Sequence, residues 1–403
     1  MRFFISGFTS KRLLISVFLL FLARMLFGVP KITVIAPTFA GTGSNNTEIQ
    51  ALNDEAERVF SNYKNSMETK LGFLPSSVHN LARAFANTSV FASDGASQRG
   101  YEGYKALSLT FGFMGAVQFP SNFNIFGEIR NAINSDEGEM GFDFIKDNMD
   151  IGLGFDIQAI NAQFGINTSK FLLEGLYLGF KFSMFDTNWA KTMSSSGFSF
   201  KTTSFGINAS YQLIKQKRLL GGLFIWRGLN LGTGYIWQNT NLGLTPALPI
   251  NEDLKNVTIP ITGVKGISEI SMPLSEAFHM VFDTNTSIIP IEAMTSIRLP
   301  GFLNLALGAG VDVAFGNSNI KANGSIDANP NDIRGLPEDG SIRMDVPPVM
   351  RFSMEGKSAP NIFNLKLMGA VGFNLGPVII DIPVTYYFLN NGYSLGVTLG
   401  LTL

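Results

Sequence analysis

From residue 104 onward, apolar residues recur at every second position along a series of short segments. The last segment, 393–403, shows the pattern most clearly, with apolar residues at the odd positions and Ser, Gly or Thr at the even ones. A period of two is typical of β-strands that have one apolar and one polar face. A tilted strand crosses a bilayer in about 9–11 residues, and its open edge needs a neighbouring strand. The segment therefore predicts a membrane-spanning strand that pairs with the first strand and closes a barrel.

Other segments show the same alternation with different strength. It is strong at 107–119, 151–158, 176–183, 204–213, 229–238, 303–313 and 363–374, interrupted at 342–354 and 378–388, and weaker at 256–264, 270–283, 289–299 and 317–327. Together these segments give about fourteen strands, or about twelve if two of the weaker ones are not strands. The higher number is favoured because the long connections 120–149, 187–201 and 241–255 then share the outer side of the membrane. We expect an all-β membrane protein, a closed antiparallel transmembrane β-barrel over residues 101–403.

A different period precedes the strands. Residues 46–93 have a helical period: from Ile49 to Met67, apolar residues recur at steps of three and four, which predicts an amphipathic helix that ends at Gly72 and Pro75. A second helix is expected from Ser76 or Ser77, with Leu81 and Phe85 on one face. We expect residues 41–100 to form a helical hatch or plug in the barrel lumen. A periplasmic appendage and an interaction arm are the alternatives.

Composition and the N-terminus agree with a secreted membrane barrel. Only 15% of the residues are charged, below the usual quarter, so the polar strand faces are too poor in charge to coat a soluble β-sandwich, which is the alternative fold. Phe119, Trp237, Tyr386 and Tyr393 lie at strand ends, as in the aromatic belts of membrane barrels.

The first residues predict a secretory signal. A basic stretch with Arg2, Lys11 and Arg12 precedes the apolar run 13–23, which is too short to span a bilayer. We predict a signal peptide over residues 1–28, with cleavage as late as residue 40 possible, and the outer membrane as the location. An inner-membrane anchor is the alternative. The net charge of −1 gives no argument for nucleic acid as a partner.

Three short stretches carry a resemblance to a known family. The sequence LARAFAN at 81–87, the glycines at 95 and 100, and FGFMGAVQ at 111–118 resemble the long-chain fatty acid transporter (FadL-like) family of outer-membrane barrels, in particular its divergent spirochaetal members. The resemblance implies a fourteen-stranded barrel, an N-terminal hatch and passage of hydrophobic molecules such as long-chain fatty acids. The expected partners are outer-membrane lipid, such a ligand and the barrel-assembly machinery. The Asn-Pro-Ala motif of the family's hatch is absent, since no Pro follows Asn87, so no binding residue is transferred from the family.

Strand parity suggests a lumenal binding site. It places these ionisable residues inward: Asp156, Lys181, Glu292, Arg298, Asp312, Arg343, Asp345, Arg351, Glu355, Lys366 and Asp381. Arg343, Arg351 and Lys366, with Phe85 of the helical segment, are the candidate ligand-binding residues, since an Arg can bind a carboxylate with two parallel hydrogen bonds. The alternative is a network in which the lumenal charges neutralise one another.

Prolines suggest a lateral opening. Pro347 and Pro348 interrupt one predicted strand and Pro383 another, and each removes a donor from the ladder. They are candidates for a gap through which a lipid-like molecule leaves sideways, with a β-bulge as the alternative.

The sequence does not predict an enzyme. Cysteine is absent, and neither His79 nor His279 has a convincing nucleophile near it in the sequence. We therefore predict no catalytic residue, metal site or cofactor. The predicted function is an outer-membrane transport channel for hydrophobic small molecules. The alternative is a surface-exposed adhesin or structural protein that acts through its extracellular loops.

Overall fold

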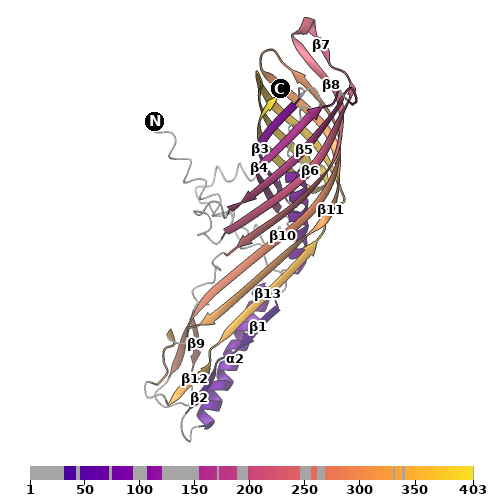
Figure 1. The fold of residues 1–403 in the computed structure, drawn as a ribbon. Coiled ribbons are helices and arrows are strands. Elements are labelled where there is room, and N and C mark those ends of the chain that lie inside the picture. Colours follow the sequence, from indigo (N-terminus) through magenta and orange to yellow (C-terminus); the bar gives the residue numbers. More distant parts are fainter. Residues whose placement is uncertain are drawn as a thin grey trace, which may run out of the picture. The chain divides into compact units, whose positions relative to one another are not determined.

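The computed structural model describes residues 31–41, 46–71, 75–93, 107–119, 154–169, 172–187, 198–245, 256–260, 268–329, 332–337 and 341–402 (Figure 1). Its helices are α2 (Asn46–Leu71) and α3 (Pro75–Ser93), with short 3-10 turns η3 (Leu220–Gly222) and η5 (Phe388–Asn390). Its strands are β1 (Lys31–Ile35), β2 (Thr38–Gly41), β3 (Leu107–Gln118), β4 (Gly154–Asn167), β5 (Leu176–Asp186), β6 (Phe198–Ile214), β7 (Lys217–Leu219), β8 (Phe224–Leu244), β9 (Asn256–Pro260), β10 (Glu269–Arg298), β11 (Leu303–Ala328), β12 (Ile342–Val346), β13 (Val349–Ser358), β14 (Phe363–Leu375), β15 (Val378–Tyr387) and β16 (Gly392–Thr402).

The two helices begin and end close to where the sequence predicts. Helix α2 stops one residue before Gly72, and α3 starts at Pro75, a residue that suits the first turn of a helix because its missing N–H has no helical partner there. Among the described residues, neither helix is apolar over enough of its length to cross a bilayer. The predicted signal peptide lies outside the described residues. Strands β1 and β2 were not predicted, and they include residues before the latest expected cleavage point.

The chain divides into two compact units. Unit 1 comprises residues 1–78, 243–281 and 320–355, and unit 2 comprises 79–242, 282–319 and 356–403. The predicted helical segment is therefore shared between the units, with α2 in unit 1 and most of α3 in unit 2.

In unit 1, α2 packs against strands of the large sheet and against a separate two-stranded sheet formed by β2 and β12. Its apolar core contains Leu52, Ala56 and Phe60 of the helix, together with residues of β2, β9, β10, β11 and β12. The side chain of Asn53 ties the helix to β2, since its Oδ1 accepts from the Phe39 N–H (2.7 Å) and its Nδ2 donates to the Phe39 carbonyl (3.1 Å). Helix α2 thus buries one face of these strands.

Unit 2 is a ring of antiparallel strands. The pairing runs β11–β14–β15–β16–β3–β4–β5–β6–β8–β10, and an additional pairing between β10 and β11 returns to the start. The last strand pairs with the first long one, as predicted, with Tyr393 opposite Val117 and Thr402 opposite Ser108. The large sheet holds fourteen strands, but only ten of the described strands form the ring. A fourteen-stranded barrel is therefore not confirmed.

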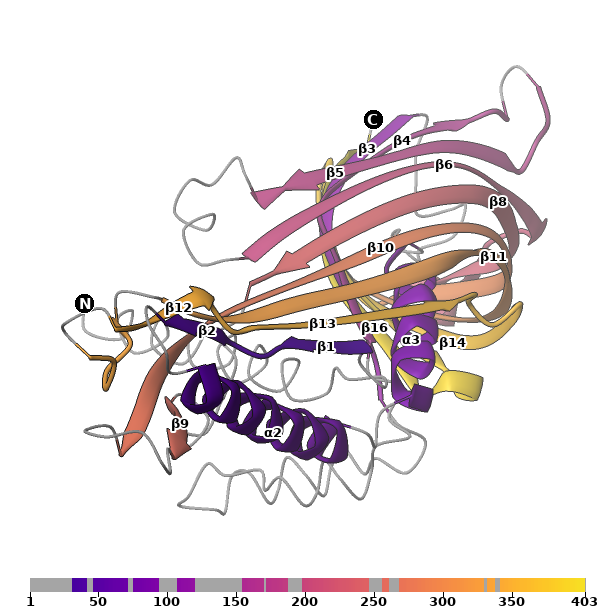
Figure 2. The same ribbon diagram turned by 90° about the horizontal axis from the view of Figure 1, so that it is seen from below.

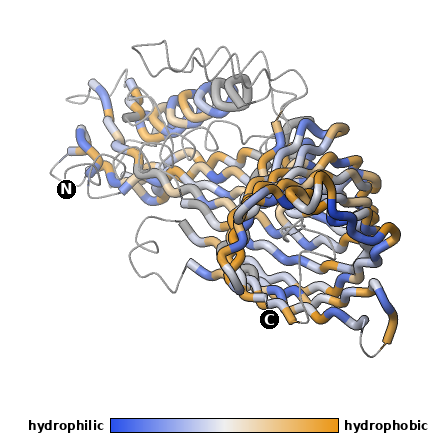
Figure 3. Tube along the Cα trace, turned by 90° about the horizontal axis from the view of Figure 1, so that it is seen from above, coloured by the Kyte–Doolittle hydropathy of each residue, from blue (hydrophilic) through white to orange (hydrophobic). Residues whose placement is uncertain are grey.

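The outer surface of the ring is apolar and its inner surface is polar. On β16, Leu395, Val397, Leu399 and Leu401 are each about half exposed, while the alternating Ser394, Thr398 and Thr402 are buried. Figure 3 shows this alternation along the strands of the ring. A soluble protein has the opposite arrangement, since it buries the apolar face. The parity that the sequence predicts for these strands is confirmed.

Strands β10 and β11 are longer than the sequence predicts. Segments 270–283 and 289–299 form one strand of 30 residues, and 303–313 and 317–327 form one of 26 (Figure 1). Both are far longer than the 9–11 residues that about one bilayer needs. The prediction of four separate strands here is wrong because no turn interrupts the pairing.

Both long strands exchange the character of their faces midway. On β11, the exposed odd positions are apolar up to Phe315 and polar beyond it, where Lys321 and Asn323 are exposed. The buried even positions change in the opposite sense, from Asp312 and Ser318 to Ile320. Strand β10 changes at the same level, since Gly316 lies against the backbone of Asn285. On both strands the exposed face is thus apolar in one half and polar in the other.

Candidate functional site

Helix α3 is buried on every side. From Leu81 to Ser93, all described side chains except Arg83 are buried, which is unusual for a helix that carries Asn, Thr and Ser. Its partners come from strands all around the ring. The aromatic rings of Phe85 and Phe282 (β10) have centroids 4.4 Å apart, and Phe91 stacks on Tyr387 (β15) at 3.8 Å. Figure 2 shows the helix beside β11, where Ala314 joins the same apolar cluster.

Polar side chains of α3 are bonded to the ring as well. Asn87 donates to Gln118 (β3) at 2.9 Å and accepts from the Asn361 N–H at 2.8 Å. Ser89 and Thr286 (β10) share a hydrogen bond of 3.0 Å. The ammonium of Lys181 (β5) binds the carbonyl of Ser93 at the C-terminus of the helix, where the helix dipole favours a positive charge.

The inner face of the ring holds an ion cluster. Lys366 is wholly buried, and its Nζ lies 2.5 Å from Glu292 and 2.7 Å from Asp312. Because Lys366 is held between two carboxylates, it has no positive charge free for an anionic ligand headgroup, which supports the alternative of a lumenal charge network at this position. Asp156 is buried in the same way and accepts hydrogen bonds from Gln238 and Thr240.

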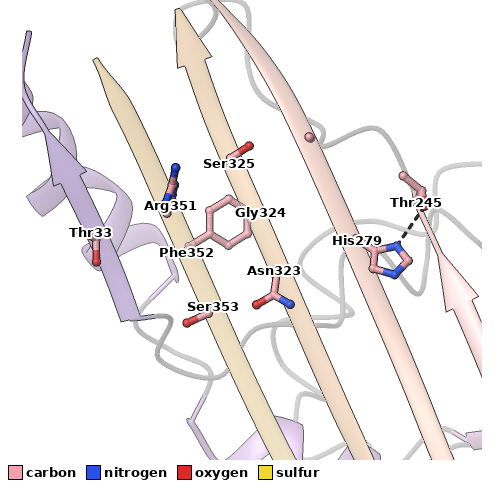
Figure 4. Close-up of a pocket in the computed structure, with 10 residues that line it drawn as sticks. Thr33, Thr245, His279, Asn323, Gly324, Ser325, Arg351, Phe352 and Ser353 are labelled. Carbon is pink, nitrogen blue, oxygen red and sulfur yellow. Dashed lines mark hydrogen bonds between the residues drawn. The ribbon is translucent and has the colours of Figure 1, made fainter. Parts of the chain in front are cut away.

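A groove with a volume of about 550 Å³ crosses the exposed face of the unit 1 strands (Figure 4). It is lined by Thr33 of β1, Arg351, Phe352 and Ser353 of β13, Asn323, Gly324 and Ser325 of β11, Ala277 and His279 of β10, and Thr245 after β8. Thr245 and His279 share a hydrogen bond of 3.2 Å. The floor is thin at Gly324, because a Cβ there would overlap the ring of Phe352.

Arg351 lies at the centre of this groove. The register places Thr33 opposite it on β1. The Lys321–Glu355 ion pair and the Gly324–Phe352 contact fix the register of β11 against β13, which puts Ser325 on the other side of Arg351. No carboxylate lines the groove, and no ion-pair partner of Arg351 is present in the described part of the chain. The site is therefore an exposed guanidinium flanked by hydroxyl and amide groups, a donor set suited to an anionic, oxygen-rich ligand.

The other predicted site residues are scattered. Phe85 packs in the ring, Lys366 belongs to the ion cluster, and Arg343 is exposed on β12 with Asp345 3.2 Å away. Arg351 is exposed on the outer face of a unit 1 sheet, so the predicted residues do not converge on one lumenal site. Thr33, Asn323, Ser325 and Ser353 were missed; their sequence signal is the polar residue at every second position.

The three prolines predicted at a lateral opening lie in different units. Pro347 and Pro348 divide β12 from β13 in unit 1, whereas a lateral opening needs a strand of the ring. Pro383 lies in β15, within the ring. Pairing between β15 and β16 stops after Asp381–Thr398 and resumes at Val384–Leu395 in the same register, so Pro383 leaves a gap without a bulge.

The solved structures that resemble this chain are only remotely similar to it. The translocator domain of the autotransporter NalP from Neisseria meningitidis has 9% identity and a TM-score of 0.27, with coverage of 78% of this chain and 93% of that one. A Pseudomonas aeruginosa FadL homologue has 8% identity and a TM-score of 0.22, with coverage of 80% of this chain and 96% of that one. The CymD monoaromatic hydrocarbon channel has 9% identity and a TM-score of 0.21, with coverage of 79% of this chain and 97% of that one. No curated protein matches in sequence.

The sequence does match one family over nearly its whole length. The matched region is residues 32–403, which takes in every described strand from β1 to β16 except the first residue of β1. The chain belongs to the Lsa36-like family.

Proposed function

We propose that this chain is an outer-membrane protein whose ring of strands spans the bilayer as a closed barrel and whose unit 1 stands in water at the cell surface. The exchange of faces within β10 and β11 carries the proposal. Exposed leucine and isoleucine side chains are stable against lipid and unfavourable in water, and the reverse holds for lysine and asparagine. A strand that changes from the first set to the second passes out of the membrane at the point of change.

The height of the apolar band fits a bilayer. On β10 the apolar part of the outer face runs from Ile289 to Ile297 and is interrupted by Thr295; Ile289 and Ile291 are exposed and Ile297 is half-buried. About nine residues at about 3.3 Å each, tilted by about 40°, span roughly 23 Å, close to the ~25 Å band of outer-membrane barrels. Aromatic side chains mark its edge: Tyr235 bonds Ser287 (2.9 Å) and Trp237 bonds Asn285 (3.2 Å), just above that face.

The connections of the ring support the orientation. One end has the connections 168–175, 215–223, 299–302 and 376–377. The other end has 119–153, 187–197, 245–268, 329–362 and the short 388–391. Outer-membrane barrels have short turns on the periplasmic side and long loops outside. Residues 243–281 and 320–355, which belong to unit 1, are thereby extracellular.

Helix α3 is proposed as the plug of this barrel, and a disulfide tests it. The chain has no cysteine, and the hydroxyls of Ser89 and Thr286 are 3.0 Å apart. The double variant Ser89→Cys/Thr286→Cys should form a cross-link under mild oxidation, detected by mass spectrometry as one disulfide-linked peptide pair. The control is Ser89→Cys/Thr402→Cys, which should not form a cross-link. Thr402 lies at the C-terminal end of β16, where it pairs with Ser108. Equal cross-linking of both pairs would contradict the plug.

We further propose that unit 1 is a binding module and that Arg351 anchors an anionic group in the groove. Dextran sulfate is a suitable probe, with neutral dextran as the comparison. Loss of a charge-assisted hydrogen bond costs about 1.5–3 kcal/mol, so Arg351→Ala should weaken binding by roughly tenfold or more, measured by calorimetry. Arg343→Ala removes an exposed guanidinium outside the groove and should change binding little. Equal losses in both variants would show non-specific attraction.

A lipid channel is the second candidate, favoured by the gap in the β15–β16 ladder at Pro383. In this hypothesis a hydrophobic molecule such as a long-chain fatty acid leaves sideways through the gap after α3 moves. Pro383→Val should then slow fatty-acid uptake into proteoliposomes, and the Ser89–Thr286 cross-link should stop it until a reductant is added. Uptake that neither change affects would remove the channel.

A further inference from the structure

The periplasmic end of the ring carries exposed leucines. Leu220 is 77% exposed, Leu223 56% and Leu219 42% at the tip of the hairpin between β6 and β8, and Leu172 (67%) and Leu173 (50%) lie in the turn between β4 and β5. The two turns are joined by an ion pair between Lys215 and Glu174 at 2.7 Å. We call these five leucines the leucine tip. Five such side chains at one site are too many for chance exposure in water.

The hairpin backbone holds these leucines outward. Leu220 has a φ of 48°, a left-handed conformation that costs energy for a residue with a Cβ, and Gly221 and Gly222 continue it at 67° and 100°. A Cβ at either glycine would meet nothing within 4 Å, so the end of the hairpin at Gly221 and Gly222 lies in open space. An exposed leucine in a strained position calls for a partner outside the chain.

Basic residues accompany the leucines. Lys217 and Arg218 are exposed on β7, directly before the tip, and Lys215 lies two residues earlier. Glu174 is the only acidic residue of the two turns. The apolar surface is also continuous with the outer face of the ring, since Leu213 (55%) and Ile214 (38%) at the end of β6 are exposed.

We propose that the leucine tip inserts into the headgroup region of the periplasmic leaflet and that Lys217 and Arg218 bind anionic phospholipid phosphates there. Leucines beside lysine and arginine match this chemistry, because the apolar side chains enter the acyl boundary while the cations remain at the phosphate level. Attraction of a basic residue to an anionic surface is worth roughly fivefold in affinity per charge. The inference rests on the proposed barrel, and it adds an anchor that fixes the barrel's depth and prefers anionic lipid.

Single cysteines in the cysteine-free chain test the proposal. An environment-sensitive dye is attached to Leu220→Cys, Leu399→Cys or Asn323→Cys in nanodiscs that contain headgroup-proximal brominated lipid. Leu399 lies on the apolar face of β16 and Asn323 on the polar face of unit 1. The dye at 220 should be quenched several-fold more than the dye at 323, and more strongly when phosphatidylglycerol is added to phosphatidylcholine. Lys217→Gln/Arg218→Gln in the 220 protein should abolish the effect of phosphatidylglycerol.

The outcomes separate the anchor from the barrel. Quenching at 399 with none at 220 leaves the barrel intact and overturns the anchor, and it would point to a periplasmic protein as the partner of the leucines. Quenching at neither position overturns the proposed function as well. If phosphatidylglycerol does not change the quenching at 220, either with or without Lys217→Gln/Arg218→Gln, the contact with lipid phosphates is overturned. All three positions are exposed, so folding is checked by the usual change of electrophoretic mobility on heating.

Discussion

Leu307→Arg should destabilise the folded protein in lipid vesicles by about 2–4 kcal/mol, the cost of an arginine on the lipid-facing surface near the middle of a bilayer. Leu307 lies on the outer face of β11 and is 58% exposed. In a soluble protein an arginine at so exposed a position would be nearly neutral. The measurement is equilibrium unfolding in urea with the protein inserted in vesicles.

The same strand supplies the control. Asn323 lies on the same outer face of β11, beyond the change at Phe315, and it is exposed. Asn323→Arg should alter the free energy of unfolding by less than about 0.5 kcal/mol. Equal effects of the two arginines would mean that both halves of β11 face the same medium, and the membrane boundary proposed here would be withdrawn.

Lys366→Met should be at least as damaging, by about 3–5 kcal/mol. The substitution keeps the length of the side chain but leaves Glu292 and Asp312 facing each other without their cation in the interior of the ring. Removal of one partner from a buried ion pair costs this much because the remaining charge is desolvated and uncompensated. The free energy of unfolding, with its denaturant slope, measures the effect.

A rescue variant separates charge from packing. Asp312→Asn in the Lys366→Met background removes one of the two uncompensated carboxylate charges. It should recover a large part of the lost free energy of unfolding. Lys357→Ala removes an exposed lysine and should be almost neutral. If Asp312→Asn lowers the stability of the Lys366→Met protein still further, the cluster is held by shape rather than by charge.

Much of the fold could be predicted from the sequence. The three- and four-residue period from Ile49 to Met67, with Gly72 and Pro75 after it, predicted the end of α2 and the start of α3 within a residue or two. Strict alternation placed β3, β5, β14 and β16, and it assigned Lys181, Asp312 and Lys366 correctly to the buried side. Local periodicity records which side chains share a face, and that information survives folding unchanged.

The candidate site could be predicted from the sequence only in small part. Parity placed Arg351 on the inner face with Lys366, yet Arg351 is exposed and Lys366 is buried. On β13 the apolar partners Met350, Phe352 and Met354 are the buried ones, whereas on β16 the apolar residues are exposed. The prediction assumed that every apolar face in the chain meets lipid.

The sequence by itself determined the positions of the helices, most of the strands and the two faces of each strand. Only the tertiary structure decided which apolar faces are covered by protein and which are left outside, that four predicted strands are two long ones, and that α2 and α3 belong to different units. The physical reason is that alternation reports a difference in polarity between two faces. Whether an apolar face is satisfied by α2 or by lipid depends on what the rest of the chain places against it.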